Sequence, residues 1–168
     1  MPEPWDLVLD ERLGINGPAP TGQPIFFRTT HHPVEARVNG QTCTESISAS
    51  DFVAVDPGPL DPKFLGRLAS ECVLECEFGH SLDFPAALVV DGWVEYPYSQ
   101  TMFASWQSGA SWESLTLEAR TLAGDWQVVL EDFGYPAGMP RTMAMPLPPL
   151  PQGRTDIRLL NNLEIHVD

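Results

Sequence analysis

The side chains most able to bind a metal or transfer protons are four histidines scattered along the chain. His31 and His32 are adjacent, whereas His80 and His166 lie far from them in sequence. Adjacent residues of a strand point to opposite faces of a sheet, so His31 and His32 can share one ion only if the backbone is irregular there. We therefore expect histidines at the surface or packed in loops, with a three-histidine zinc site as the alternative.

The three cysteines, Cys43, Cys72 and Cys76, are an odd and small set that argues against a disulfide framework. Residues 71–78 alternate between apolar and acidic side chains, which is typical of a strand and places Cys72 and Cys76 on one face. Free cysteines on such a face are usually buried. We therefore expect thiols in the core.

Acidic side chains offer two further kinds of chemistry. Asp91 and Glu95 flank Trp93, and Asp132 precedes a second loop. Loop carboxylates of this kind can hold a structural calcium ion, because calcium prefers oxygen ligands, and apart from such an ion we expect no cofactor. A glycosidase needs two carboxyl groups about 5–10 Å apart on facing walls, which proximity in sequence does not establish. The simplest expectation is a solvated acidic surface.

No motif for a nucleophile or a phosphate group accompanies these residues. The sequence contains no Gly-x-Ser-x-Gly, no His-Glu-x-x-His and no glycine-rich phosphate loop. We therefore expect a protein that is not an enzyme, and a metal- or carboxylate-dependent hydrolase is the alternative.

Aromatic residues gather between residues 91 and 112, in a stretch that Pro97 and Gly109 interrupt. Rings in exposed loops stack on sugars or anchor partner proteins, whereas rings in a core fill space. Two places are open to these rings: the core, where large aromatic rings usually pack, and a recognition surface for a glycan or a partner protein. The rings assigned to this surface are Trp93, Tyr96, Tyr98 and Trp106, together with Tyr135 in a separate loop at 134–138.

Composition limits the partners of the chain. Its 168 residues and 18.5 kDa are enough for one domain with a sizeable core. With 9 basic and 23 acidic residues the net charge is 9 − 23 = −14, which argues against binding to nucleic acid or to an anionic membrane surface.

Neither a membrane span nor a signal peptide is apparent in the sequence. The longest apolar run, residues 86–90, is far shorter than a bilayer requires, and residues 1–20 have no basic start followed by an apolar stretch. We expect a cytoplasmic protein by default, or an extracytoplasmic one if the chain is cut from a longer precursor.

The elements that would position these residues are mostly short strands. Asn39-Gly40 predicts a tight hairpin between residues 34–38 and 41–47, and a second hairpin is predicted between 115–120 and 126–130. Asp61 followed by Pro62 predicts the start of one short helix near 62–69. Further strands are predicted at residues 25–30, 51–55, 71–78, 87–90, 143–147, 157–160 and 163–167.

About eight to ten short strands with one helix favour an all-β fold, an antiparallel β-sandwich of the jelly-roll or galactose-binding-like type. We divide the chain into an N-terminal arm, residues 1–24, and a single sandwich domain, residues 25–168.

The second half of the chain resembles a known family. The segment GWVEYPYSQTMFASWQSG begins at Gly92 and is followed by DFGYPAGMPRT and by the final NNLEIHVD. In this order the three segments resemble the β-rich C-terminal region of bacterial FG-GAP/UnbV-type (ASPIC) repeat proteins, over residues 89–168. The dipeptide His166-Val167 stands where the family pattern has Tyr-Trp. The resemblance implies an accessory β-sandwich without catalytic residues, and the calcium-binding FG-GAP repeats themselves are absent from this sequence.

These features together predict a non-catalytic recognition or accessory domain that binds a glycan or a partner protein through its aromatic residues. A structural module that packs within a larger multi-subunit or multi-domain assembly is the alternative, and a hydrolase is the second alternative.

Overall fold

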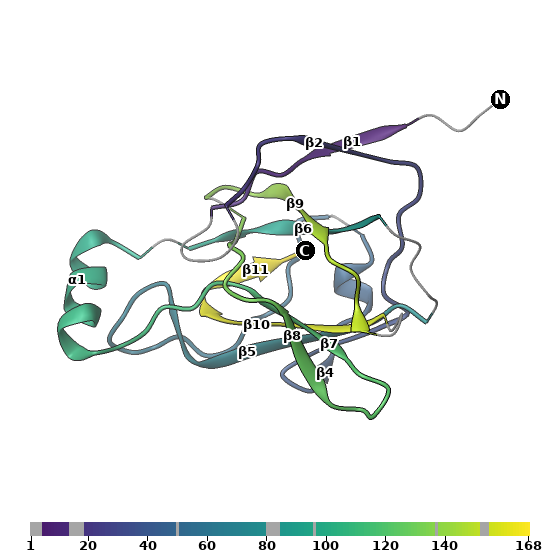
Figure 1. The fold of residues 1–168 in the computed structure, drawn as a ribbon. Coiled ribbons are helices and arrows are strands. Elements are labelled where there is room, and N and C mark those ends of the chain that lie inside the picture. Colours follow the sequence, from purple (N-terminus) through teal and green to yellow (C-terminus); the bar gives the residue numbers. More distant parts are fainter. Residues whose placement is uncertain are drawn as a thin grey trace.

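The computed structural model describes residues 5–13, 19–49, 51–79, 85–95, 97–136, 138–151 and 155–168. Within them the chain forms three antiparallel sheets, one α-helix and one short 3₁₀ helix, η1 (Glu45–Ile47) (Figure 1). The prediction of an all-β antiparallel sandwich is confirmed, and its finer assignment as a jelly roll stays a prediction.

The largest sheet has six strands and contains both predicted hairpins. The return strand predicted over 41–47 covers only Gln41–Thr42, because Glu45–Ile47 form η1. The turn of the first hairpin is formed by Asn39 and Gly40, whose φ angles of 50° and 81° are the left-handed values that a tight hairpin turn needs. In spatial order the strands are β4 (Gln41–Thr42), β3 (Glu35–Val38), β5 (Arg67–Glu77), β10 (Asp156–Leu163), β7 (Thr116–Arg120) and β8 (Trp126–Leu130).

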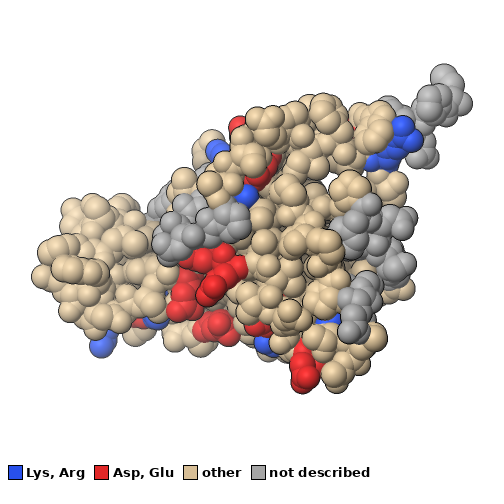
Figure 2. Space-filling view, viewed as in Figure 1, with Lys and Arg blue, Asp and Glu red and all other residues tan. Residues whose placement is uncertain are grey.

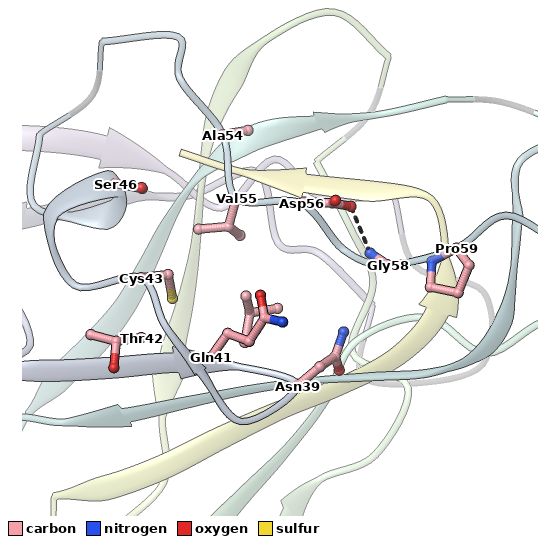
Figure 3. A pocket seen from close by; sticks show the side chains of 11 residues that line it. Asn39, Gln41, Thr42, Cys43, Ser46, Ala54, Val55, Asp56, Gly58 and Pro59 are labelled. Atoms are coloured by element: carbon pink, nitrogen blue, oxygen red, sulfur yellow. Dashed lines mark hydrogen bonds between the residues drawn. The ribbon is translucent and has the colours of Figure 1, made fainter.

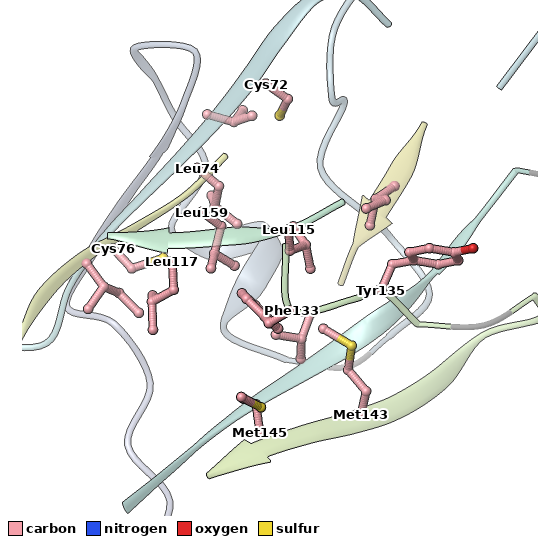
Figure 4. Close-up of a cluster of buried hydrophobic side chains, with 14 of the residues drawn as sticks. Cys72, Leu74, Cys76, Leu115, Leu117, Phe133, Tyr135, Met143, Met145 and Leu159 are labelled. Carbon is pink, nitrogen blue, oxygen red and sulfur yellow. The ribbon is translucent and has the colours of Figure 1, made fainter. Parts of the chain in front are cut away.

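The second sheet contains β11 (Ile165–Val167), β6 (Ala86–Val94) and β9 (Arg141–Leu147), and it packs on the six-stranded sheet. Alternate side chains of both sheets point into the space between them, as the period of two in the sequence requires. Cys72 and Cys76 lie in this core, so the prediction of buried thiols is confirmed. Figure 4 shows part of the core, including Leu74, Leu117, Phe133, Met143 and Leu159.

A third layer is formed by β1 (Asp6–Leu9) and β2 (Pro24–Phe27), which among the described strands pair with each other alone. We call these two strands the β1–β2 ribbon. It lies over β9 on the outer side of the three-stranded sheet (Figure 1). The predicted boundary between arm and domain, at residue 24, falls inside this ribbon.

The predicted helix over 62–69 is wrong. Asp61 accepts a hydrogen bond from the N–H of Lys63 (2.8 Å), but the chain then makes a turn and β5 begins at Arg67. Gly66 explains why the turn does not continue as a helix, because its φ of +81° lies outside the helical range. Asp61 therefore makes the hydrogen bond expected of a cap, but it caps a turn and not a helix.

The predicted edge strand over 51–55 is also wrong, since these residues form bends and irregular chain. The carboxylate of Asp168 accepts hydrogen bonds from the N–H groups of Asp51 (3.2 Å) and Phe52 (2.7 Å). These donors would otherwise be available to a neighbouring strand, so the C-terminal residue takes the place of a sheet partner.

The aromatic segment contains the one α-helix of the described residues, α1 (Ser99–Ser108), which the sequence did not predict. The helix begins directly after Tyr98, whose backbone is extended, and it ends at Gly109 in the left-handed conformation with φ of 74°. In Figure 1 α1 projects from one side of the sandwich.

Candidate protein-binding surface

Helix α1 presents an apolar surface that nothing in the described chain covers. The side chains of Tyr98, Met102, Phe103 and Trp106 are 67%, 38%, 58% and 73% exposed, and we call these four residues the α1 surface. Residues 98, 102 and 106 follow one another at intervals of four, and 103 and 106 are three apart, so all four share one side of the helix. The rings of Phe103 and Trp106 lie 5.8 Å apart between centroids.

In the described part of the chain, few groups attach the helix to the sandwich. Ser105 is its single buried residue, and the indole N–H of Trp112 donates a hydrogen bond to the Ser105 hydroxyl. Behind the helix, Asn162 of β10 accepts a hydrogen bond from the N–H of Glu113 (2.8 Å), and Arg67 donates one to the carbonyl of Ser111 (3.0 Å). These contacts fix the connection that follows α1 and leave the α1 surface facing outward.

Charge is distributed unevenly around this surface. None of the ten residues of α1 is charged, although the whole chain carries a net charge of −14. Exposed carboxylates lie in the segments that lead into and follow the helix, at Glu95 and Glu113, and Glu131 is exposed in a nearby connection. Figure 2 shows acidic side chains gathered between the projecting lobe that contains α1 and the sandwich. The surface is therefore an apolar face beside an acidic border.

The five rings assigned from the sequence do not form one surface. Tyr98 and Trp106 lie together on α1, and Tyr96 lies outside the described residues. Tyr135 is only 8% exposed and packs in the core, where its backbone pairs with Leu13 in an isolated bridge. The buried position of Tyr135 therefore does not support the recognition role expected for it.

Trp93 lies on β6, away from the α1 surface. Its half-buried ring stacks on the ring of His166, with centroids 5.1 Å apart and planes inclined by 17°. The Nε2 atom of His166 is 3.6 Å from a carboxylate oxygen of Glu164. Because one face of the indole is already covered by the imidazole, Trp93 packs chiefly against its own chain.

Two apolar residues of the surface, Met102 and Phe103, were missed in the sequence. Their signal was the helical spacing of apolar residues between Tyr98 and Trp106, followed by a glycine that could end a helix. The interruptions at Pro97 and Gly109 were interpreted as a loop, whereas they are the two ends of α1.

In the part of the chain that the structure describes, the candidate metal ligands do not come together. Among the described residues no group of three or more histidine, cysteine or acidic side chains is arranged to hold an ion. Asp91 instead accepts a hydrogen bond from the hydroxyl of Thr142, and Asp132 accepts one from the N–H of Ser114 (3.1 Å). These two of the three proposed calcium ligands therefore bond to their own chain, while the third, Glu95, is exposed. His80 of the proposed zinc set lies outside the described residues.

A hollow of about 620 Å³ lies between β4, η1 and residues 54–59 (Figure 3). Two polar side chains in its wall bond to the wall itself: Asn39 donates to the carbonyl of Pro57 (3.0 Å), and Asp56 accepts from the N–H of Gly58 (2.9 Å). Cys43 also lines the hollow, and burial raises the pKa of its thiol above the usual value. A thiol in its neutral form is a poor nucleophile, so Cys43 is not activated for nucleophilic attack.

Comparison of the chain with family models, with curated proteins and with solved structures finds no match in any of the three. The resemblance of residues 89–168 to FG-GAP/UnbV-type proteins therefore stays an expectation. No helix among the described residues is long and apolar enough to cross a membrane.

Proposed function

We propose that this chain is a non-catalytic recognition domain that binds a partner protein through the α1 surface. The observation that carries the proposal is a projecting, uncharged helix with Tyr98, Phe103 and Trp106 each more than half exposed. Aromatic and methionine side chains are enriched at the centres of protein interfaces, and tryptophan and tyrosine carry much of the binding free energy there.

The partner that fits this surface has an apolar groove with basic residues at its rim. An amphipathic helix binds such a groove through residues spaced by three and four, which is the spacing of the α1 surface. The exposed carboxylates of Glu95, Glu113 and Glu131 would face the basic rim and accelerate association at low salt. A glycan is the weaker candidate, because the rings stand beside methionine and phenylalanine rather than in a cluster of polar side chains.

The helix itself gives the proposal a second support. Isolated helices of this length are marginal in water, and α1 buries only Ser105 against the sandwich. A groove that covers the α1 surface would supply the packing that the helix lacks in the isolated chain. Binding would then stabilise α1 as well as bury it.

The experiment compares four forms of the full chain: the unmodified protein, Phe103→Ala, Trp106→Ala, and Leu122→Ala as a matched control. Leu122 is 64% exposed at the turn between β7 and β8, so its loss removes a comparable apolar side chain from another part of the molecule. Each form is immobilised and exposed to an extract of the source organism, and bound proteins are quantified by mass spectrometry. A captured protein is then purified and titrated against each form at low and high salt.

We expect one protein to bind the unmodified chain and the Leu122→Ala control, to lose about tenfold or more in affinity with each α1 variant, and to bind less tightly at high salt. Hydrogen exchange of the α1 amides should slow in that complex. Equal binding by all four forms would overturn the proposal. A ligand found instead on a glycan array, with binding that depends on Trp106, would replace the protein partner with a carbohydrate.

A further inference from the structure

The β1–β2 ribbon is apolar on both of its faces. Val8 and Ile25 are opposite each other in the register and half-buried, so their side of the ribbon faces the sandwich. Leu7 and Phe26 are also opposite each other, on the other side, where they are 55% and 59% exposed. Strands with apolar residues on both sides are typical of sheets covered on both faces, yet only one face of this ribbon is covered by the described chain.

The exposed side extends beyond this one pair. Leu9, two residues after Leu7 in β1, lies on the same side as Leu7. Trp5, two residues before Leu7, lies on that side as well. Trp5 is 57% exposed, and the guanidinium of Arg28 lies 4.2 Å from the centre of its ring. We call Trp5, Leu7, Leu9 and Phe26 the outer face of the ribbon.

The ribbon is held firmly to the sandwich, so its outer face is a fixed surface. Arg12 lies three residues after β1, and it donates hydrogen bonds to Asp10 (2.9 Å) and to the carbonyl of Phe133 (2.6 Å) in the core. Asp10 also accepts hydrogen bonds from the N–H (2.9 Å) and the hydroxyl (2.8 Å) of Thr21. Both members of the Asp10–Arg12 ion pair are almost fully buried.

The charges of the chain indicate what covers this face. Within β1 and β2 the outer face carries no carboxylate, because Asp6 lies on the same side as Val8, whereas the whole chain has a net charge of −14. Two copies that meet at this face therefore bring few carboxylates together. Arg28 places one positive charge beside the outer face, against the ring of Trp5.

We propose that the outer face of the β1–β2 ribbon is the interface of a homodimer, in which a second copy packs its own outer face on it about a two-fold axis. A two-fold axis uses the same patch on both copies, so an apolar face is complementary to itself. The two ribbons would pack face to face as sheets do, with Phe26 and Leu7 of each copy against the other. Because each copy offers only two short strands, the dimer is expected to be reversible and to depend on concentration.

Sedimentation equilibrium of the full chain over a series of concentrations, at low and high salt, tests this proposal. We expect a monomer–dimer equilibrium that shifts toward the dimer at high salt, because salt screens the repulsion between two chains of charge −14. The variants Leu7→Asp and Phe26→Asp should each raise the dimer dissociation constant about tenfold or more, since they place an unpaired carboxylate in an apolar interface.

The variant Phe103→Asp distinguishes this interface from the α1 surface, and it should leave the equilibrium unchanged. Far-UV circular dichroism should be the same for all forms, because each substituted side chain is exposed. A chain that is monomeric at every concentration would overturn the proposal, and so would a dimer that persists in both ribbon variants or that is lost only in Phe103→Asp. Capture of a different protein by the ribbon of a monomeric chain would likewise overturn it.

Discussion

Replacing Arg12 with methionine should destabilise the protein more than most single substitutions. Arg12 connects the end of β1 to the core, since it pairs with Asp10 and donates to the carbonyl of Phe133. Methionine keeps much of the volume of the side chain but removes the charge and all the donors. The Asp10 carboxylate is then left buried without its cation.

The expected magnitude follows from the burial of the pair. The side chains of Arg12 and Asp10 are 2% and 1% exposed, and removal of one partner of a buried ion pair costs about 3–5 kcal/mol. The double variant Asp10→Leu/Arg12→Met removes both charges. It should be more stable than Arg12→Met alone, because the uncompensated carboxylate is then absent. Its remaining cost comes from the lost hydrogen bonds of Thr21 and Phe133.

The pH dependence gives the prediction a second measurement. Burial raises the pKa of Asp10, but hydrogen bonds from Thr21 and Arg12 outweigh it, so the pKa is lowered from the ordinary value of 3.8. The stability that a lowered carboxyl pKa contributes is fully present above the unfolded value and is lost as the pH falls through the folded value. In Arg12→Met the cation is gone and the pKa of Asp10 rises. The gap between the two proteins should therefore be largest near neutral pH and should shrink as the pH falls from the raised pKa of Asp10 in the variant to its lowered pKa in the unmodified protein.

Urea unfolding of the three forms at neutral and acid pH measures these differences, and hydrogen exchange of β1 and β2 reports whether the ribbon detaches first. Arg12→Met should exchange faster in both strands than the unmodified chain. Unfolding free energies that agree within about 0.5 kcal/mol for Arg12→Met and the unmodified protein would refute the reasoning, because surface substitutions typically stay within that range.

Three further predictions concern stability and the thiols. Gly92→Ala should destabilise the chain by about 1–3 kcal/mol or more in urea unfolding, because the new Cβ atom would lie 2.2 Å from the carbonyl oxygen of His166; a variant as stable as the parent would show that β6 and β11 can separate freely. Gly66→Ala should also destabilise, by about 1–2 kcal/mol from its φ of +81° alone, and its Cβ would lie 2.7 Å from the carbonyl oxygen of Glu95; an unchanged urea midpoint would contradict this. Burial raises the pKa of Cys72 to about 11 and that of Cys76 to about 12. The unfolding free energy should therefore fall as the pH rises above the unfolded thiol pKa of 9.0, by about 1.4 kcal/mol per pH unit for each thiol. The variant Cys72→Ala should flatten this slope, and an equal slope in both proteins would rule out a raised pKa for Cys72.

The sandwich could be predicted from the sequence because short stretches of residues specify its strands and hairpins. Alternation over residues 71–78 and 115–120, and the Asn39-Gly40 turn, each specify a strand or a hairpin within a few residues. The errors arose where a local signal had two meanings. Asp61-Pro62 can cap a helix or a turn. A turn forms here because Gly66 lies close to the backbone of Glu95, which is distant in sequence.

The candidate site was only partly predictable for the same reason. Tyr98 and Trp106 were identified by type, but the sequence does not say which aromatic rings face inward. That depends on the neighbours of each ring: Tyr135 is covered by the N-terminal segment around Leu13, and Trp93 is stacked on His166 at the other end of the chain. Contacts between residues so far apart in sequence leave no local periodicity to detect.

The two proposed surfaces have one feature in common: their apolar side chains take no part in packing the core. The apolar residues of the sandwich pack against one another, and Phe133, Leu115 and Leu117 are fully buried. Neither the α1 surface nor the outer face of the ribbon contributes to that packing, so the fold gives no reason for Trp106 or Phe26 to be aromatic. If both proposals hold, the dimer displays two copies of α1. A surface coated densely with the partner protein should then retain the dimer longer than the Leu7→Asp monomer, because two linked contacts dissociate more slowly than one. Equal retention of both forms on such a surface would mean that the two α1 helices cannot engage together, while leaving each interface to be judged by its own variants.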